Sequence, residues 1–363
     1  MSLIFGYNKY INKNYFFNNI CKNEISKNNN NSNNSLNLNC LNKQKKIIII
    51  FTLIIINFII YNRYKKIIRH SNYKYYKKKN IKVCLCTPCK NENRYIREYV
   101  EYYKRYGIDK IFLYDNNDIN GEKLEDSIAD YINTSFVKVF NWRGKKKQVF
   151  KIMNDCYKRT FNKFDWIIFY EVDEYIYLKN IKNIKVYLNR DTFKNCQTIR
   201  LNWVHHTDNN LIYYDNRTLH ERFPEVEPNA KMNIKGSRNS VKSILRGNIP
   251  NITINNIHML NINLKGCNGF GKIQIINDIN AIDTNDSDFR NYYIDHFYSK
   301  SLEEFIEKIN KGDVAHEQAI WLKKFRIRNY FERNNITLEK LNFIEKYTKL
   351  NLSYYKKKLK NIN

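Results

Sequence analysis

Apolar and polar residues form regular blocks along the second part of the chain, and their spacing predicts alternating strands and helices. Four short apolar runs have the length and composition of buried strands, and they cover residues 81–86, 110–115, 136–140 and 166–170. Between them, apolar residues recur at helical spacing over 93–106, 122–132 and 149–161. This alternation predicts an α/β fold with a doubly wound, mostly parallel sheet flanked by helices. Ligands of such sheets bind beyond the carboxyl ends of the strands.

The pattern changes after the fourth strand and again near the C-terminus. From about Thr192 to Ile282 it predicts shorter strands and loops, and from Leu302 onward it is mostly helical. We therefore assign residues 81–330 to one globular domain and residues 331–363 to a C-terminal helical tail.

The N-terminal part of the chain differs from the globular domain. Residues 1–46 form an Asn-rich tail that we expect to be disordered, because 15 of the first 42 residues are Asn. Residues 47–64 read IIIIFTLIIINFIIYNRY and are flanked by basic residues on both sides. About 17 to 25 apolar residues span a bilayer as a helix, so we predict one N-terminal transmembrane helix rather than a buried core element.

Residues 65–80 form a basic, tyrosine-rich stalk between this segment and the domain. Contact with anionic lipid head groups and a solvated linker are equally compatible with this composition. The protein is thus expected to be a single-pass membrane protein, whose domain would face the Golgi lumen in a eukaryote.

Composition and charge exclude some classes of protein and leave one alternative open. The 363 residues include 10 Gly and 4 Pro and are 43% hydrophobic, which excludes collagen-like and wholly disordered chains. The formal net charge is +28 at pH 7, which is typical of proteins that bind nucleic acid or anionic membranes. Half of this excess lies in the first 80 residues, and the domain contains no RNA- or DNA-binding signature. We therefore predict no nucleic-acid partner.

Three cysteines follow a C-x-C-x-x-C pattern at Cys84, Cys86 and Cys89. The pattern suggests zinc, but no second Cys/His pair follows at a suitable spacing. Cys84 and Cys86 fall on one face of the first predicted strand, so buried thiols are the better interpretation. Disulfides are allowed in an oxidising compartment but not required.

The most informative segment is the acidic cluster after the fourth apolar run. Glu171, Asp173 and Glu174 lie within four residues, and such carboxylates repel one another unless positive charge lies between them. Glu171 and Asp173 share one side of an extended chain, so they suit one divalent cation. A solvated acidic turn is the alternative. Nucleotide-sugar transfer needs such an arrangement, because a cation neutralises the leaving diphosphate.

Several ordered blocks resemble glycosyltransferase family 92 and related family-2-like transferases of the GT-A fold. The run CKNENRYIREYVEYYKRYGIDKIFLYDNND at 89–118 resembles the opening of the family, and DHFYSKSLEEFIEKINKG at 295–312 resembles a later block. Between them lie Gln148 with Cys156, the triplet 173–175, and matching segments at 200–203, 221–223, 242–244 and His258. The chain departs from the family pattern at Glu171, where Asp is usual, and at Asp295, where Asn is commoner.

The resemblance implies a nucleotide-sugar donor, in particular a UDP-sugar such as UDP-galactose, and a glycan acceptor. It implies Mn²⁺ or Mg²⁺ held by Glu171, Asp173 and His296, although His296 would alternatively contact phosphate. It further implies nucleotide-sugar contacts from these residues: Lys90, Asn91, Glu92, Asp115, Gln148, Lys242 and Lys300. Asp115 also has the alternative role of starting a turn with the two Asn residues that follow it.

An inverting transfer, which the family resemblance implies, needs a carboxylate base for the acceptor hydroxyl. The candidates are Glu174, Asp208, Glu221 and Glu317, and the sequence does not choose among them. Two alternative functions stay open. One is a catalytically inactive relative that binds nucleotide sugars or glycans, suggested by Glu171, and the other is a basic nucleic-acid-binding protein.

Overall fold

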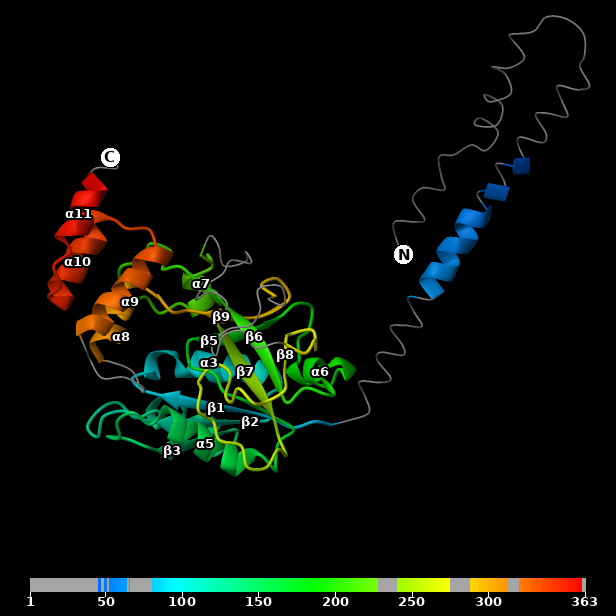
Figure 1. Cartoon of the computed structure of the whole chain (residues 1–363), viewed down its shortest axis with the longest axis horizontal. Helices are drawn as coiled ribbons and strands as arrows, with labels where there is room; N and C mark the ends of the chain where they lie inside the picture. Colours follow the sequence, from blue (N-terminus) through cyan, green and yellow to red (C-terminus); the bar gives the residue numbers. More distant parts are fainter. Residues whose placement is uncertain are drawn as a thin grey trace, which may run out of the picture. The chain divides into compact units, whose positions relative to one another are not determined.

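The computed structural model describes residues 45–46, 49–50, 52–63, 65, 80–227, 240–274, 288–311 and 320–360. The chain divides into two units, residues 1–78 and residues 79–363. The second unit contains the sheet and the helices that surround it (Figure 1).

The first half of the sheet follows the predicted alternation closely. Its elements are β1 (Val83–Cys89), α3 (Asn93–Arg105), β2 (Lys110–Asp115), α4 (Glu125–Asn133), β3 (Val137–Asn141), α5 (Val149–Thr160) and β4 (Trp166–Ile168). β1 pairs in parallel with both β2 and β4, and β2 pairs in parallel with β3. The predicted α/β class is therefore confirmed.

Helices cover both faces of this parallel half, as a doubly wound sheet requires. Leu85 of β1 belongs to the same buried cluster as Tyr99 of α3 and Ile128 of α4. Cys84, on the other face of β1, belongs to the cluster that contains Met153 of α5. β1, β2 and β4 are buried on both sides, which explains why their sequences are nearly continuous apolar runs, whereas the edge strand β3 exposes Lys138.

The second half of the sheet is mixed, which the predicted mostly parallel sheet did not anticipate. Its strands are β5 (Glu174–Leu178), β6 (Thr198–His205), β7 (Val241–Arg246), β8 (Gly266–Cys267) and β9 (Tyr292–His296), and the order across the sheet is β3-β2-β1-β4-β7-β6-β9-β5, with β8 beside β6. β7 is antiparallel to β4 and β6, and β5 is antiparallel to β9.

Among the described residues, the connections of the mixed half contain three short helices: α6 (Ile184–Leu188), η2 (Asp191–Phe193) and α7 (Leu219–Arg222). β7 pairs with β4 and with β6, which lie far from each other in the sequence. Long-range pairing rather than a local pattern therefore sets the direction of β7.

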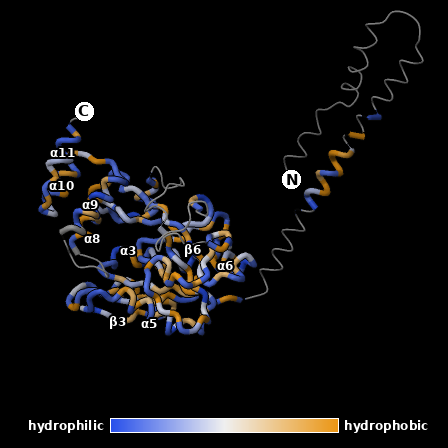
Figure 2. Tube along the Cα trace, in the orientation of Figure 1, coloured by the Kyte–Doolittle hydropathy of each residue, from blue (hydrophilic) through white to orange (hydrophobic). Residues whose placement is uncertain are grey.

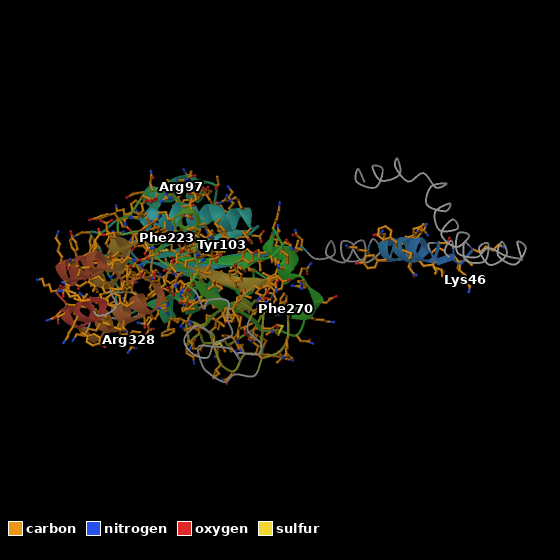
Figure 3. All side chains as sticks on the ribbon, turned by 90° about the horizontal axis from the view of Figure 1, so that it is seen from above. Lys46, Arg97, Tyr103, Phe223, Phe270 and Arg328 are labelled. Carbon is orange, nitrogen blue, oxygen red and sulfur yellow. A yellow bond between two sulfur atoms is a disulfide. The ribbon has the colours of Figure 1, made fainter. Side chains whose placement is uncertain are left out.

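Large aromatic side chains fill the core of the second unit. Tyr103 of α3 and Phe223, just after α7, are fully buried, whereas Arg97 lies on the outer side of α3, where it pairs with Asp130 (Figure 3). The Tyr103 hydroxyl donates a hydrogen bond of 2.8 Å to the carbonyl oxygen of Glu174. Helix α3 is thereby tied to the start of β5.

Two disulfides join elements that are distant in the sequence. Cys86 of β1 is bonded to Cys156 of α5, and Cys196, ahead of β6, is bonded to Cys267 of β8. Cys84 and Cys89 are buried free thiols. The predicted burial of Cys84 and Cys86 is confirmed, and the structure adds the pairing that the sequence left open.

The C-terminal helices build a separate apolar cluster beside the sheet (Figure 1). They are α8 (Leu302–Lys311), α9 (Ile320–Arg333), α10 (Leu338–Thr348) and α11 (Ser353–Lys360). Asp208, in the loop after β6, holds this layer in place, since it accepts hydrogen bonds from Tyr330 and, at 2.6 Å, from Lys340. Asp208, one of the candidate bases, is thus already engaged with α9 and α10.

In the first unit, residues 52–63 are helical, and Figure 2 colours most of this helix as hydrophobic. Among the described residues, no helix is both long and apolar enough to cross a membrane. The predicted tail and most of the predicted stalk, like the candidate base Glu317, lie outside the described residues.

Candidate functional site

The three carboxylates of the acidic cluster lie in the turn between β4 and β5, which we call the acidic turn (Glu171, Asp173 and Glu174). Glu174 is fully buried and accepts two hydrogen bonds, one of 2.9 Å from the Glu171 backbone N–H and one of 3.0 Å from the Trp203 indole. The strand register places Glu174 opposite His296 of β9. The turn is therefore held against the ends of β6 and β9.

Two lysines supply the positive charge that this cluster requires. The Lys242 ammonium of β7 lies 2.7 Å from Glu171 Oε1 and 3.3 Å from Glu174 Oε1. The Lys308 ammonium of α8 lies 2.7 Å from Asp173 Oδ2. Lys242, a predicted donor contact, pairs with the acidic turn in this structure. Lys308 was missed, although it lies within the family-like block at 295–312.

Burial and neighbouring charge shift the protonation of the acidic turn in opposite directions. Burial alone would raise the pKa of Asp173, but the charges of Lys308 and Lys300 help to outweigh it and lower that pKa below its usual range. Burial raises the pKa of Glu174 to about 8, against the opposing charge of Lys242. The same burial therefore has opposite outcomes at the two carboxylates, because Asp173 is surrounded by more positive charge.

His296 faces Asp173 from β9, with its Nε2 atom 3.9 Å from Asp173 Oδ1. Its ring packs against Trp203, with the ring centroids 4.2 Å apart. Burial lowers the pKa of His296 well below its usual value, so the imidazole is neutral and has a free lone pair.

The three predicted metal ligands are only partly brought together. A cation about 2.1 Å from each of two donors bridges atoms up to about 4 Å apart, so Asp173 Oδ1 and His296 Nε2 suit one divalent cation. Glu171 is engaged by Lys242. Within the described residues, no group of three or more His, Cys, Asp or Glu side chains is gathered closely enough to hold a metal ion. The predicted three-residue set is therefore incomplete in this structure.

A cavity of about 510 Å³ lies beyond the carboxyl end of β1, where the doubly wound pattern predicted a ligand site. Its lining combines the N-terminus of α3 with one face of α8 and part of α10: Asn91, Glu92, Arg94, Tyr95, Glu122, Tyr213, Lys300, Glu303, Glu304, Ile306, Glu307, Lys308, Asn310, Phe343 and Tyr347. Three of the predicted donor contacts, Asn91, Glu92 and Lys300, thus line a single cavity.

Lys308 connects this cavity to the acidic turn, because it lines the cavity and pairs with Asp173. Lys300 is buried nearby, with its ammonium 3.7 Å from the centre of the Tyr95 ring and 3.9 Å from Glu92 Oε2. Two cations therefore lie where the sheet, α3 and α8 meet, and an anionic ligand in the cavity would be within their reach.

Asp115 builds the loop that follows β2. Its Oδ1 accepts a 3.0 Å hydrogen bond from the Asn117 N–H, and its Oδ2 accepts one of 2.9 Å from Arg143. Asn117 in turn accepts a hydrogen bond from the Asn91 N–H at the edge of the cavity. The turn-forming role of Asp115 is thus present in the structure. Arg143, which also binds three backbone carbonyls of the 119–122 loop, had no signal in the sequence.

The remaining predicted residues lie elsewhere. Lys90 pairs with Asp118 at 3.6 Å. Gln148 stands at the N-cap position of α5 without a side-chain capping bond, and its amide donates a hydrogen bond to the Lys146 carbonyl. Glu221 completes a capping box with Thr218 at the start of α7. Neither Glu174 nor Glu221 lines the cavity. The carboxylates that do were not predicted as bases, and among them Glu307 pairs with Arg94 at 3.1 Å.

The profile of Glycosyltransferase family 92 matches residues 79–333 of the chain. A family 92 protein of Oryza sativa subsp. japonica is 28% identical to the chain over 109 residues, which are 29% of this chain. One of Arabidopsis thaliana is 31% identical over 105 residues, which are 28% of this chain. The matched part spans 18% of the length of each of these relatives.

Solved structures of glycosyltransferases are more distant. S. aureus TarS 1–349 is 13% identical, with a TM-score of 0.33 over 75% of this chain and 76% of that one. The mannosyltransferase PcManGT of Pyrobaculum calidifontis, in complex with GDP-Man and Mn²⁺, is 6% identical, with a TM-score of 0.28 over 48% and 51% of the two chains. Scores this low carry no information about activity.

Proposed function

Because the chain belongs to glycosyltransferase family 92, we propose that it transfers a sugar from a nucleotide-sugar donor to a glycan acceptor. The observation that carries the proposal is Lys308, which joins the buried acidic turn to the cavity at the end of β1. Family membership makes a UDP-sugar the expected donor, with UDP-galactose as the first candidate, and inversion the expected stereochemistry.

The charges of the site suit a diphosphate leaving group. Transfer of the sugar leaves negative charge on the diphosphate, and cations fixed in a water-poor site stabilise that charge. Lys300 and Lys308 line the cavity and are held there by Tyr95 and Asp173 before any ligand binds. Their placement therefore requires little reorganisation when the donor enters.

A divalent cation fits two of the predicted ligands. Asp173 and His296 would hold Mn²⁺ or Mg²⁺, which supplies Lewis-acid stabilisation of the departing diphosphate when bound. Lys308 already neutralises the other oxygen of Asp173. The chain itself thus contributes positive charge at this position.

The test is release of UDP by the purified full chain from UDP-galactose, UDP-glucose and UDP-N-acetylglucosamine, with Mn²⁺ or with EDTA. We expect turnover of one donor, and a loss of about 100-fold in Asp173→Asn, since removing one key charge-stabilising group typically costs 10²–10³ in rate. The control is Asp130→Asn, which makes the same chemical change at an exposed residue of α4. Equal turnover in both variants would contradict the assigned role of Asp173.

One observation favours a second candidate function. Glu171 pairs with Lys242, and among the described residues it does not form a three-ligand metal site with Asp173 and His296. A relative that binds nucleotide sugars without transferring them would not need that site. Such a protein would bind UDP, measured by calorimetry, and release none from any donor in the presence of glycan acceptors.

We also propose that residues 47–64 anchor the protein in a membrane as a single span. The described part of this segment is helical over 52–63, and its Ile, Leu and Phe side chains are exposed all round. A helix that is apolar on every side needs an apolar surrounding. Extraction of membranes at alkaline pH should leave the full chain in the pellet, and its release into the supernatant would refute the anchor.

A further inference from the structure

The cavity has two chemically different ends along α8. The charged end holds Lys300 and Glu92, near the N-terminus of α8. At the other end, Asn310 donates a 3.3 Å hydrogen bond to the backbone carbonyl of Tyr347 on α10. Glu303 and Asn310 both line the cavity and are seven residues apart, or about 10 Å along a helix. Lys308 lies two residues before Asn310, but its ammonium is directed to Asp173 of the acidic turn. A ligand bound at the two lysines thus leaves room beside α10.

Aromatic rings line the side of the cavity that α10 contributes to, and we call them the aromatic wall (Tyr213, Phe343 and Tyr347). The ring of Phe343 lies 5.8 Å from that of Tyr213 and 4.6 Å from that of Tyr347. Tyr213 is 62% exposed and Tyr347 is 48% exposed. Side chains of this size usually bury most of their surface, and a cluster of exposed aromatic rings on a cavity typically marks a binding surface.

The aromatic wall is held rigidly by the fold. Thr337 caps the start of α10, and Lys340 on its first turn is buried against Asp208. Leu341 and Ile344 of the same helix are buried in the cluster of C-terminal helices. Helix α10 lies beyond residues 79–333, the part that matches the family profile. Phe343 and Tyr347 thus come from outside the matched region, whereas Tyr213 lies within it.

We propose that the aromatic wall binds a sugar ring of the acceptor glycan, an inference that rests on the proposed transferase function. Aromatic faces pack well against the C–H faces of pyranose rings, while hydroxyl groups at the ring edge need polar partners. The wall offers both, since the polar groups of Glu303, Glu307 and Asn310 line the same cavity. The donor diphosphate belongs at the lysines, so the aromatic end is left for the acceptor.

The proposal is tested by saturation-transfer NMR on the full chain with methyl glycosides of galactose, glucose, N-acetylglucosamine and mannose as probes, alongside calorimetry with UDP. We expect Tyr347→Ala and Phe343→Ala to weaken binding of the responding glycoside at least fivefold and to change UDP affinity less than twofold. Tyr347→Trp should retain the binding. Tyr354→Ala, at an exposed tyrosine of α11 outside the cavity lining, is the matched control and should change neither.

The other outcomes overturn the proposal in different ways. The Tyr347 side chain is 48% exposed, so we expect Tyr347→Ala to fold. Unchanged glycoside binding in this variant would show that the aromatic wall does not bind the sugar. A loss of UDP affinity alone would assign the rings to the nucleotide base, and no glycoside signal from the unmodified chain would exclude a sugar site. Failure of UDP binding with glycoside binding intact would instead contradict the proposed donor function.

Discussion

Two buried charge networks lie beside the cavity, and they are satisfied to different degrees. In the first, the Glu304 network, the carboxylate of Glu304 accepts hydrogen bonds of 2.6 and 3.1 Å from Arg222, and others from Tyr95 and Ser301. In the second, the acidic turn, Asp173 Oδ2 is paired with Lys308, whereas among the described residues the partner of Oδ1 is His296 at 3.9 Å.

A distance of 3.9 Å is too long for a hydrogen bond. Both carboxylate oxygens of Glu304 thus accept hydrogen bonds from protein groups, as in a structural ion pair. In the acidic turn, Asp173 Oδ1 is available to a ligand. Buried charges are expensive unless they are paired, so an incompletely paired one at the edge of a cavity is a mark of function.

The largest expected effect comes from breaking the structural network. Arg222→Met would leave the Glu304 carboxylate buried without its cation, so the free energy of unfolding should fall by about 3–5 kcal/mol. Urea denaturation followed by circular dichroism measures this loss. Asp173→Asn, which removes a charge from the acidic turn, should cost clearly less stability. If both cost the same, the distinction between the two networks fails.

The second prediction sharpens the functional side of the comparison. Lys308→Met should lower donor turnover about tenfold and destabilise the protein by about 1–2 kcal/mol, because Asp173 loses its nearest counter-ion in a buried setting. The matched control is Lys151→Met, which makes the same change at an exposed lysine of α5. Steady-state kinetics and urea denaturation on the same samples separate the two effects. Normal turnover in Lys308→Met would make this lysine purely structural.

The smallest effect concerns a third group of charges, around His220 on α7. Burial would lower the pKa of His220, but the carboxylates of Asp295 and Glu98, 3.7 and 4.0 Å from its ring nitrogens, outweigh it and raise that pKa to about 9. A histidine with a raised pKa in the folded state contributes stability that is fully present below about pH 6.5 and is lost as pH rises through about 9.

Unfolding free energy should therefore decrease between pH 6.5 and pH 9 by about 1 kcal/mol, since the 39% exposed side chain is partly screened by solvent. In His220→Gln this decrease should be absent. Urea denaturation curves at half-unit pH steps measure the unfolding free energy of both proteins. If it decreases with pH as much in His220→Gln as in the original chain, another group causes the decrease.

The sequence predicted the parallel half of the fold well, and the reason is physical. Its central strands β1, β2 and β4 are buried on both faces and its helices bury one side, so local periodicity carries the information. The same periodicity predicted that Asn91 and Glu92 would lie beyond the end of β1, where the cavity is found. The mixed half was missed because β7 and β9 are placed by pairing with distant strands rather than by local pattern.

The sequence by itself therefore determined the α/β class, the family and the concentration of carboxylates after β4. Only the tertiary structure determined which cationic side chains pair with those carboxylates. Lys308 lies 135 residues beyond Asp173, and Phe343 of the aromatic wall reaches the cavity from outside the region that matches the family. Such partners are selected by the packing of whole helices against the sheet edge, a long-range property that residue spacing does not encode.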